Sequence, residues 1–258
     1  MGKKLLQVNK LTVDIKGKKA VDEASFSVNK GEITCIIGQS GSGKSMSINA
    51  LLGILPPTAT SMGEAHFSGM NLLAMSEKKL QQVRGTKIFT IFQDAANSFN
   101  PSIKMKHQLY HLTGKKLGHS FRVFRKKIHE ILRDLQFTEP QAITEHYPFQ
   151  LSGGMLQRCM VACALYIEPI LLIADEPTSA LDMILQKELI EMLINMNQNT
   201  RTSILLVTHD LGVAAEAADE LIVMLEGKVI ETGNTLTIFD HPNHPYTKKL
   251  LEGRLLTC

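Results

Sequence analysis

The chain has 258 residues, of which 44% are hydrophobic and 21% are charged, and this is the composition of an ordinary globular protein. Its formal net charge of +3 is too small to indicate a nucleic-acid-binding protein by itself. No apolar run approaches the roughly 18 residues that a membrane-spanning helix needs, and the N-terminus has no apolar signal region. We therefore expect a cytoplasmic protein, which can still sit on a membrane through a partner.

The first third of the chain predicts strands around one glycine-rich loop. Residues 5–15 and 24–38 have the pattern of β segments, and the Asn-Lys-Gly sequence at 29–31 supplies a turn. The apolar end of the second segment leads into the glycine-rich loop. A helix is predicted to follow over 44–55, closed by a proline pair. Residues 86–93 then show the pattern of a short buried strand.

From about residue 95 to 160 the pattern becomes helical. Ser120 is a suitable N-cap for a helix whose apolar side chains recur at helical spacing. These side chains are Phe121, Phe124, Ile128, Ile131, Leu132 and Leu135. After residue 168 the sequence predicts strands over 170–175, 203–208 and 220–225, and helices over 182–196 and 211–218. Such alternation implies a parallel sheet, so the fold class is α/β with a helical insertion in the middle of the chain.

Four cysteines lie in apolar or terminal positions without the paired spacing of a metal site: Cys35, Cys159, Cys163 and Cys258. Small buried side chains in a reducing compartment explain them more simply than disulfides do.

The glycine-rich loop GQSGSGKS at 38–45 matches the pattern G-x-x-x-x-G-K-[ST]. Its glycines let backbone N–H groups surround a β-phosphate, and the N-terminus of the following helix adds a positive field. We expect Lys44 to reach the β- and γ-phosphates and the Ser45 hydroxyl to bind Mg²⁺. The other loop residues are assigned to the nucleotide as well: Gly38, Gln39, Ser40, Gly41, Ser42 and Gly43. A chance glycine-rich turn would lack the predicted strand before it and the helix after it.

An acidic strand end adds the second half of this chemistry. The aliphatic residues 171–174 bring Asp175 and Glu176 to the carboxyl end of a buried strand, where ligands sit in open α/β sheets. We expect Asp175 to hold the Mg²⁺ shell and Glu176 to polarise an attacking water. Alone these residues would be an ordinary acidic strand end, but a phosphate loop in the same chain favours the catalytic interpretation.

A second glycine-rich stretch, LSGGMLQR at 151–158, follows more than a hundred residues after the phosphate loop. The order of phosphate loop, LSGG, ADEP and VTHD resembles that of the ATPase subunits of ABC transporters, over almost the whole chain. This resemblance implies a P-loop NTPase (RecA-like) core with an N-terminal antiparallel β region and an inserted α-helical subdomain, using ATP and Mg²⁺. It also implies two ATPase domains that meet head to tail. Ser152, Gly153 and Gly154 would then contact the γ-phosphate of the nucleotide held by the partner's loop.

Other site residues follow from the same resemblance, position by position. Gln93 resembles the glutamine that contacts Mg²⁺ and water and responds to the transmembrane partner. His209 resembles the histidine that contacts the γ-phosphate. The loop that couples the two ATP sites corresponds to Ser179, Ala180, Leu181 and Asp182.

Two positions depart from the family pattern. Met155 stands where glutamine is commoner, but it lies beyond the Ser-Gly-Gly contacts, so we expect little loss. Ile15 stands where the family usually stacks an aromatic ring on adenine. Packing against the adenine should therefore be aliphatic and weaker.

The resemblance divides the chain into four parts. They are the N-terminal β region with the phosphate-loop part of the core (1–94), the helical subdomain ending in the signature (95–160), the rest of the core (161–235) and a C-terminal tail (236–258).

Three stretches resemble importer ATPases for peptides and nickel: RGTKIFTIFQDAANSFNP (84–101), YPFQLSGGMLQR (147–158) and HPNHPYTKKLL (241–251). The second stretch and the short tail that stops at Cys258 favour the nickel or metal-chelate branch over the oligopeptide branch. The implied partners are a second, different ATPase subunit, two permease subunits and an extracytoplasmic substrate-binding protein. This chain would then be peripheral, on the cytoplasmic face of the cell membrane, and would bind no nucleic acid.

Two other classes stay open at this point. A soluble ABC ATPase acting on nucleic acid or the ribosome usually carries coiled-coil or zinc-bearing insertions, or two ATPase halves, and none is visible in the sequence. A P-loop kinase has no use for the LSGG stretch and would transfer phosphate to a small acceptor instead of water.

Overall fold

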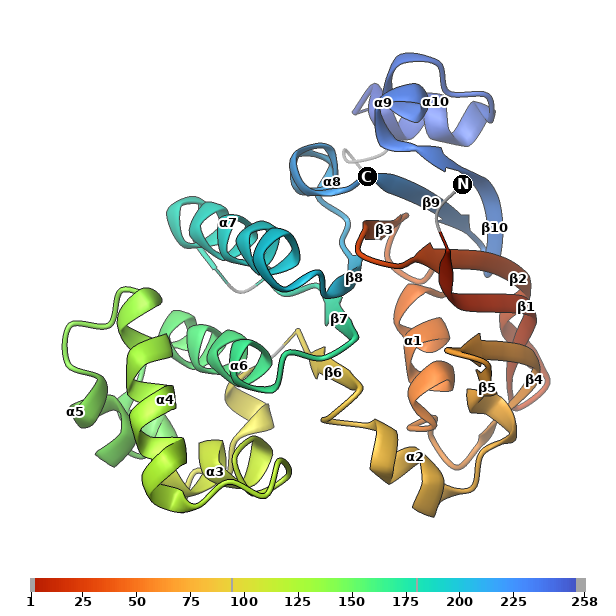
Figure 1. Ribbon diagram of the computed structural model, residues 1–258. Coiled ribbons are helices and arrows are strands. Elements are labelled where there is room, and N and C mark those ends of the chain that lie inside the picture. The colour runs from red at the N-terminus through yellow and green to blue at the C-terminus, as the bar shows by residue number, and fades with distance from the viewer. Residues whose placement is uncertain (1–2, 94, 180, 254–258) are drawn as a thin grey trace. The chain divides into compact units, whose positions relative to one another are not determined.

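The structure of the protein, a computed structural model, describes residues 3–93, 95–179 and 181–253 (Figure 1). Packing divides these residues into two compact units. The first unit runs to Gln81 and resumes at Ser203, and the second unit is Gln82–Thr202. This division is based on packing alone and does not test the four parts that the resemblance implies. Those four parts therefore stay predictions. No helix among the described residues is long and apolar enough to cross a membrane.

An antiparallel sheet in the first unit has the strand order β2-β1-β4-β5. Its strands are β1 (Lys4–Ile15), β2 (Lys18–Asn29), β4 (Ala59–Phe67) and β5 (Met70–Asn71). In β1 the most completely buried side chains change from even positions, Leu6 and Val8, to odd positions, Leu11 and Val13, while Leu5 and Thr12 are buried slightly less. The pairing of β1 with β2 shifts between Val8 and Leu11, and this bulge keeps all four side chains in the interior. The predicted N-terminal antiparallel region is confirmed.

The parallel strands of the first unit surround β3 (Ile33–Ile37). Both β8 (Ser203–Val207) and β9 (Glu220–Leu225) pair with it in parallel, and β10 (Lys228–Asn234) pairs with β9 antiparallel. All five residues of β3 are buried, as expected for a central parallel strand covered on both faces. The parallel sheet that the sequence predicted is confirmed.

The first unit also contains helices α1 (Lys44–Leu52), α8 (Leu211–Ala217), α9 (Thr235–Asp240) and α10 (Pro245–Leu251), and a 3₁₀ turn at Leu72–Ala74. The division between the units falls inside α2 (Glu77–Val83). α1 ends at Gly53, whose φ of 64° lets its N–H bond back to the carbonyls of Ala50 and Asn49. The predicted continuation to residue 55 is wrong, because a left-handed glycine ends the helix before the prolines.

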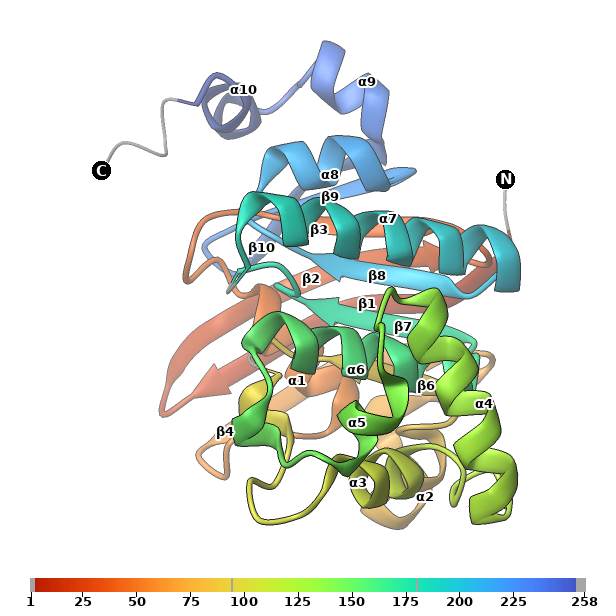
Figure 2. The same cartoon turned by 90° about the vertical axis from the view of Figure 1, so that its left-hand side faces the viewer.

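The second unit is mainly helical around two strands, β6 (Ile88–Ile91) and β7 (Leu171–Asp175), which pair in parallel. Its helices are α3 (Met105–Leu112), α4 (Phe121–Asp134), α5 (Pro140–Glu145), α6 (Gly153–Ile167) and α7 (Met183–Thr200), with 3₁₀ turns at Ala96–Ser98 and Pro148–Gln150. Helices α3 and α4 pack on α6, and α5 packs on α3 and α4 (Figure 2). The predicted helical insertion is confirmed.

Helix α4 forms for the reasons that the sequence indicated. Ser120 caps it, with Oγ accepting a hydrogen bond from the Val123 N–H. Phe124, Ile128 and Leu132 are buried at a spacing of four residues, which is one face of the helix. This face packs against α6. The apolar positions of the amphipathic pattern therefore mark the side of the helix that faces the interior of the second unit.

Candidate functional site

The phosphate loop joins β3 to α1 in the first unit, as predicted. Gly43 has a φ of 100°, and a Cβ built on it would lie 2.6 Å from the carbonyl oxygen of Ala20. A Cβ on Gly38 would collide with the backbone carbonyl of Met224 in β9. Both positions require glycine, because the obstacle is backbone that has no rotamer to change. The motif glycines are therefore needed for the packing of the loop against β2 and β9.

The ammonium of Lys44 lies inside the loop. Its Nζ donates hydrogen bonds to the carbonyl oxygens of Gly38 at 2.7 Å and Gln39 at 3.0 Å, and the residue is only 5% exposed. Phosphate oxygens are stronger, charge-assisted acceptors than these neutral carbonyls. The position of Lys44 is thus compatible with its predicted contact with the β- and γ-phosphates.

A cavity of about 640 Å³ opens beside the loop at Gly41. Its lining consists of Ile15, Lys18, Lys19, Ala20, Gly41, Glu226 and Gly227. None of these lining residues is aromatic. The carbonyl of Ser42 accepts a hydrogen bond of 3.0 Å from the Gly227 N–H, which ties the loop to the turn between β9 and β10. Ile15 therefore lines a cavity next to the phosphate loop, where the sequence predicts that the adenine binds.

His209 lies at the carboxyl end of β8 in the first unit, and its side chain is exposed. The residues on either side hold the turn. The Asp210 N–H donates to Thr208 Oγ1 at 3.0 Å, and the Asp210 carboxylate caps α8. An exposed imidazole at a strand end is compatible with the predicted contact with a γ-phosphate.

In the second unit, Asp175 ends β7 and Glu176 follows it, as predicted. Asp175 is 9% exposed, and Glu176 has a φ of 46°, which is uncommon for a residue with a Cβ. Ser179 holds this turn, since its N–H and its Oγ donate to the Glu176 carbonyl at 3.3 and 3.1 Å. Other described residues with a Cβ, Glu168 and Glu226 among them, also have a positive φ, so this conformation does not single out Glu176 and its catalytic role stays a prediction.

Gln93 is exposed two residues after β6. Ile91, the last residue of β6, pairs with Ala174 of β7. Because the two strands are parallel, Gln93 and Asp175 leave them at the same edge. The structure therefore brings these two predicted Mg²⁺ ligands to one edge of the second unit.

The signature residues open α6. The Oγ of Ser152 accepts a hydrogen bond of 3.3 Å from the Met155 N–H, so Ser152 is the N-cap of the helix. Ser152 and Gly153 are exposed, whereas Gly154 is buried. A Cβ on Gly154 would lie 2.9 Å from Cδ1 of Leu185 in α7, while one on Gly153 would have no neighbour within 4 Å. The sequence did not reveal that Gly154 lies against the Leu185 side chain of α7, which a Cβ would displace.

The predicted coupling loop leads into α7. Asp182 caps this helix, because its Oδ1 accepts hydrogen bonds from the N–H groups of Ile184 and Leu185 at 3.0 and 2.9 Å. The adjacent Met183 and Ile184 are 88% and 75% exposed. Ala180 lies outside the described residues. An exposed apolar pair beside this loop is compatible with a contact to another subunit.

The predicted site residues thus form two sets. The first unit contains Ile15, the loop residues 38–45 and His209. The second unit contains Gln93, Ser152, Gly153, Gly154, Asp175, Glu176, Ser179 and Asp182. That the two sets serve nucleotides together stays a prediction.

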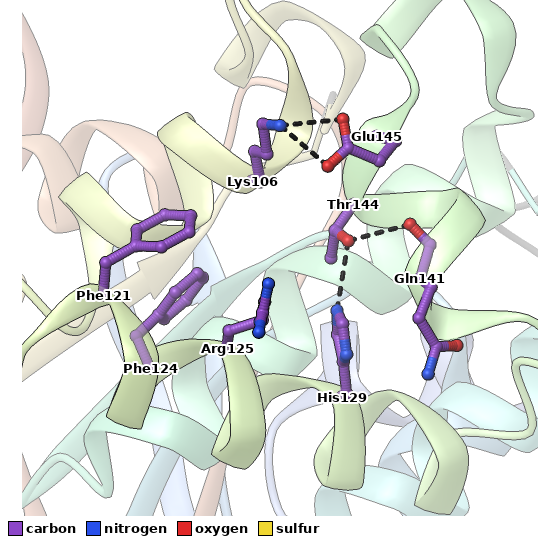
Figure 3. Close-up of a pocket in the computed structure, with 8 residues that line it drawn as sticks. All are labelled: Lys106, Phe121, Phe124, Arg125, His129, Gln141, Thr144 and Glu145. Carbon is purple, nitrogen blue, oxygen red and sulfur yellow. Dashed lines mark hydrogen bonds and ion pairs between the residues drawn. The ribbon is translucent and has the colours of Figure 1, made fainter.

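A further cavity of about 370 Å³ lies among α3, α4 and α5 of the second unit (Figure 3). Its lining residues are Lys106, Phe121, Phe124, Arg125, His129, Gln141, Thr144 and Glu145. Lys106 pairs with Glu145 at 2.7 Å, and His129 Nε2 lies 3.1 Å from Thr144 Oγ1. Burial lowers the pKa of His129, and the positive charges of Arg133 and Arg125 lower it further. The cavity therefore combines an aromatic wall with basic side chains.

Three cysteines, Cys35, Cys159 and Cys163, are buried with free thiols, as the sequence predicted. Burial raises the pKa of the Cys159 thiol to about 12, so it has little thiolate character. Cys258 lies outside the described residues.

Comparisons with known proteins agree with the motifs. A family model described as ABC transporter matches residues 21–179. The dipeptide transport ATP-binding protein DppD of Escherichia coli is 40% identical over 254 residues, which cover 96% of this chain and 78% of that protein. The metal-staphylopine import system ATP-binding protein CntD of Staphylococcus aureus is 37% identical over 234 residues, covering 91% of this chain and 86% of that protein.

Among solved structures, the dimeric ATP-binding cassette MJ0796 bound to ADP and Pi has a TM-score of 0.78 at 26% identity. The match covers 89% of this chain and 98% of that one. The relatives named above are transport proteins, and they do not support an ATPase acting on nucleic acid or the ribosome. The chain belongs to the ABC transporter family, as an ATP-binding subunit that hydrolyses ATP to drive transport.

Proposed function

We propose that this ATPase energises the import of small peptides or of metal chelates, nickel complexes among them. The observation that carries the proposal is the similarity, over more than 90% of this chain, to DppD, a dipeptide transport protein, and to CntD of a metal-staphylopine import system. Their identities of 40% and 37% are too close to separate the two cargo classes. The nickel-type form of YPFQLSGGMLQR favours the chelate. Partner subunits select the cargo, since the ATPase need not contact it.

The proposed complex contains two ATPases, two permease subunits and an extracytoplasmic binding protein, with this chain on the cytoplasmic face of the membrane. The second ATPase is a different paralogue and meets this chain head to tail. The exposure of Ser152 and Gly153 at the start of a 15-residue helix supports this arrangement. A helix N-terminus offers backbone N–H groups and a positive field to an incoming phosphate. The related cassette MJ0796 is dimeric.

In the proposed reaction, the loop N–H groups and Lys44 bind the phosphates while Glu176 polarises the attacking water. Mg²⁺ fits the donor set of Ser45, Asp175 and Gln93, because hydroxyl, carboxylate and amide oxygens are the hard ligands that this cation prefers. When bound, Mg²⁺ neutralises charge on the phosphates.

Three further roles belong to the same proposal. His209 contacts the γ-phosphate, and the turn from Ser179 to Asp182 couples the two ATP sites. Ile15 packs against the adenine without stacking on it. The cavity at Gly41 supports the last role by its position beside the loop.

An uptake assay tests the proposal. Cells would carry the intact gene, lack it, or carry Lys44→Ala, and would be given either a radiolabelled dipeptide or radiolabelled nickel with a chelator. We expect uptake of one cargo class to fall to background in both the deletion and the Lys44→Ala strain. Unchanged uptake of both classes would contradict the proposal. Salt-sensitive nucleic-acid binding by the pure protein would favour the alternative class.

A further inference from the structure

The C-terminal stretch HPNHPYTKKLL is held as a structured element of the first unit. In β10, the Glu231 carboxylate accepts hydrogen bonds from the N–H groups of Asn243 and His244 at 2.8 and 3.1 Å. His244 in turn caps α10, since its Nδ1 accepts from the Tyr246 N–H at 3.1 Å. Thr247 and Leu250 are the buried residues on the inner face of this short helix. The tail therefore has a defined position, which local sequence patterns did not indicate.

This arrangement brings Tyr246 to the phosphate loop. The Tyr246 hydroxyl accepts a hydrogen bond of 3.1 Å from the backbone N–H of Gln39, and the residue is only 9% exposed. Gln39 is the second residue of the loop, and 207 positions separate the two residues in the chain. Donor and acceptor both belong to the first unit.

The peptide groups of Gln39 are held on both sides. Its N–H donates to Tyr246, and its carbonyl accepts from Lys44 Nζ at 3.0 Å and from the Ser42 N–H at 3.2 Å. Rotation of the peptide before Gln39 would break the bond to Tyr246. In the same peptide, the Gly38 carbonyl accepts from Lys44 Nζ at 2.7 Å, so the tail hydroxyl and Lys44 together fix the orientation of the first turn of the loop.

We infer that Tyr246 is a positioning residue for nucleotide binding. A phosphate loop binds through N–H groups that must already point inward, so an anchor outside the loop lowers the cost of ordering it. Tyr246 supplies this anchor and touches no nucleotide itself. The inference rests on the proposed role of loop residues 38–45 in nucleotide binding.

The test uses Tyr246→Phe in the full chain, which removes the hydroxyl and keeps the buried ring. Tyr110→Phe is the matched control, because the Tyr110 hydroxyl also makes one backbone hydrogen bond, donating to the His119 carbonyl at 3.0 Å. We expect the affinity for a fluorescent ATP analogue, and for ADP in competition, to fall about three- to tenfold in Tyr246→Phe, the worth of one ordinary hydrogen bond. The control should keep the wild-type affinity.

Amide hydrogen exchange supplies a second readout that a general loss of stability would not produce. The Gln39 amide should exchange faster in Tyr246→Phe than in Tyr110→Phe. The two variants are compared under conditions in which their free energies of global unfolding are equal. Unchanged nucleotide affinity together with unchanged Gln39 exchange would overturn the inference. Lys44→Ala separates this failure from a failure of the loop assignment. If Lys44→Ala abolishes binding while Tyr246→Phe does nothing, only the role of Tyr246 is wrong. If both variants bind normally, the loop does not bind the nucleotide.

Discussion

At the scale of single residues, Ser152 combines a structural task with its expected ligand contact. Its Oγ already caps α6, so replacing Ser152 by arginine would remove a cap worth about 1 kcal/mol as well as add bulk. A substitution at Gly154 would also change packing, because its Cβ would approach Leu185. Gly153 is exposed and lies in the first turn of α6, and a Cβ built on it has no neighbour within 4 Å. It is the signature residue at which folding and partner contact can be separated.

We therefore predict that Gly153→Asp leaves ATP binding by the isolated monomer close to normal. An acidic residue in the first turn of a helix is tolerated or slightly stabilising. In the head-to-tail dimer its carboxylate would face the partner's γ-phosphate, and ATP-dependent dimerisation and complex ATPase activity should fall about 100-fold or more, since like charges at close range repel by several kcal/mol. Gly153→Ala is the matched control without charge. An equal loss of the monomer's own ATP affinity would place the signature in cis and contradict the head-to-tail arrangement.

The second prediction at this scale concerns Glu176. Glu176→Gln keeps the shape of the side chain, and the new residue must adopt the same positive φ as the glutamate. The variant should therefore fold and bind ATP. Turnover should fall about 100-fold or more, because general-base catalysis contributes 10²–10⁴ in rate. Single-turnover ATP hydrolysis in the assembled complex measures the effect. A variant that retains most of the wild-type rate would show that another group is the base.

At the scale of elements, the contact between α6 and α7 decides what the signature glycines tolerate. Gly154→Ala forces Leu185 to move, because the new Cβ would lie 2.9 Å from Cδ1. Because only the end of the Leu185 side chain meets the new Cβ and no backbone does, we predict a small loss in the free energy of unfolding, about 1 kcal/mol or less, at or below the low end of what overpacking costs. Gly153→Ala should be neutral or slightly stabilising, since alanine is the better helix former. Urea unfolding of the two variants tests this difference, and equal stabilities would contradict the packing role of Gly154.

The helical segment of about 95–150, together with Gln93, is the surface on which we expect the permease to dock. Val123 on α4 is 51% exposed, and Leu236 on α9 is 71% exposed and serves as the control position. A cysteine at residue 123 should cross-link to a permease subunit in membranes, whereas one at residue 236 should not. Cys35, Cys159 and Cys163 are buried and should not compete, and Cys258, which lies outside the described residues, is replaced by serine in both variants. Cross-links from residue 236 alone would refute this docking surface.

At the scale of the whole molecule, the expected chemistry draws on both compact units. The phosphate loop, Ile15 and His209 belong to the first unit, while Glu176 and the signature belong to the second. Loss of binding in Lys44→Ala and loss of turnover in Glu176→Gln would show that both units are needed for one reaction. The pairing of this chain with a second ATPase adds a further level, because the signature is expected to complete a nucleotide site on the partner.

The sequence by itself determined the features that are local. The phosphate loop is readable because its motif glycines, lysine and serine all lie within eight consecutive positions, and α4 is readable because a buried helix face repeats every three to four residues. Strand β4 was missed because it is largely exposed and has little apolar alternation, and it forms because β1 offers it a partner. The tertiary structure alone decided that Gly154 lies against Leu185 and that Tyr246 reaches Gln39 across 207 positions. Contacts of this kind depend on which distant segments of the chain the fold brings together. Neither hydrophobic periodicity nor motif spacing contains that information.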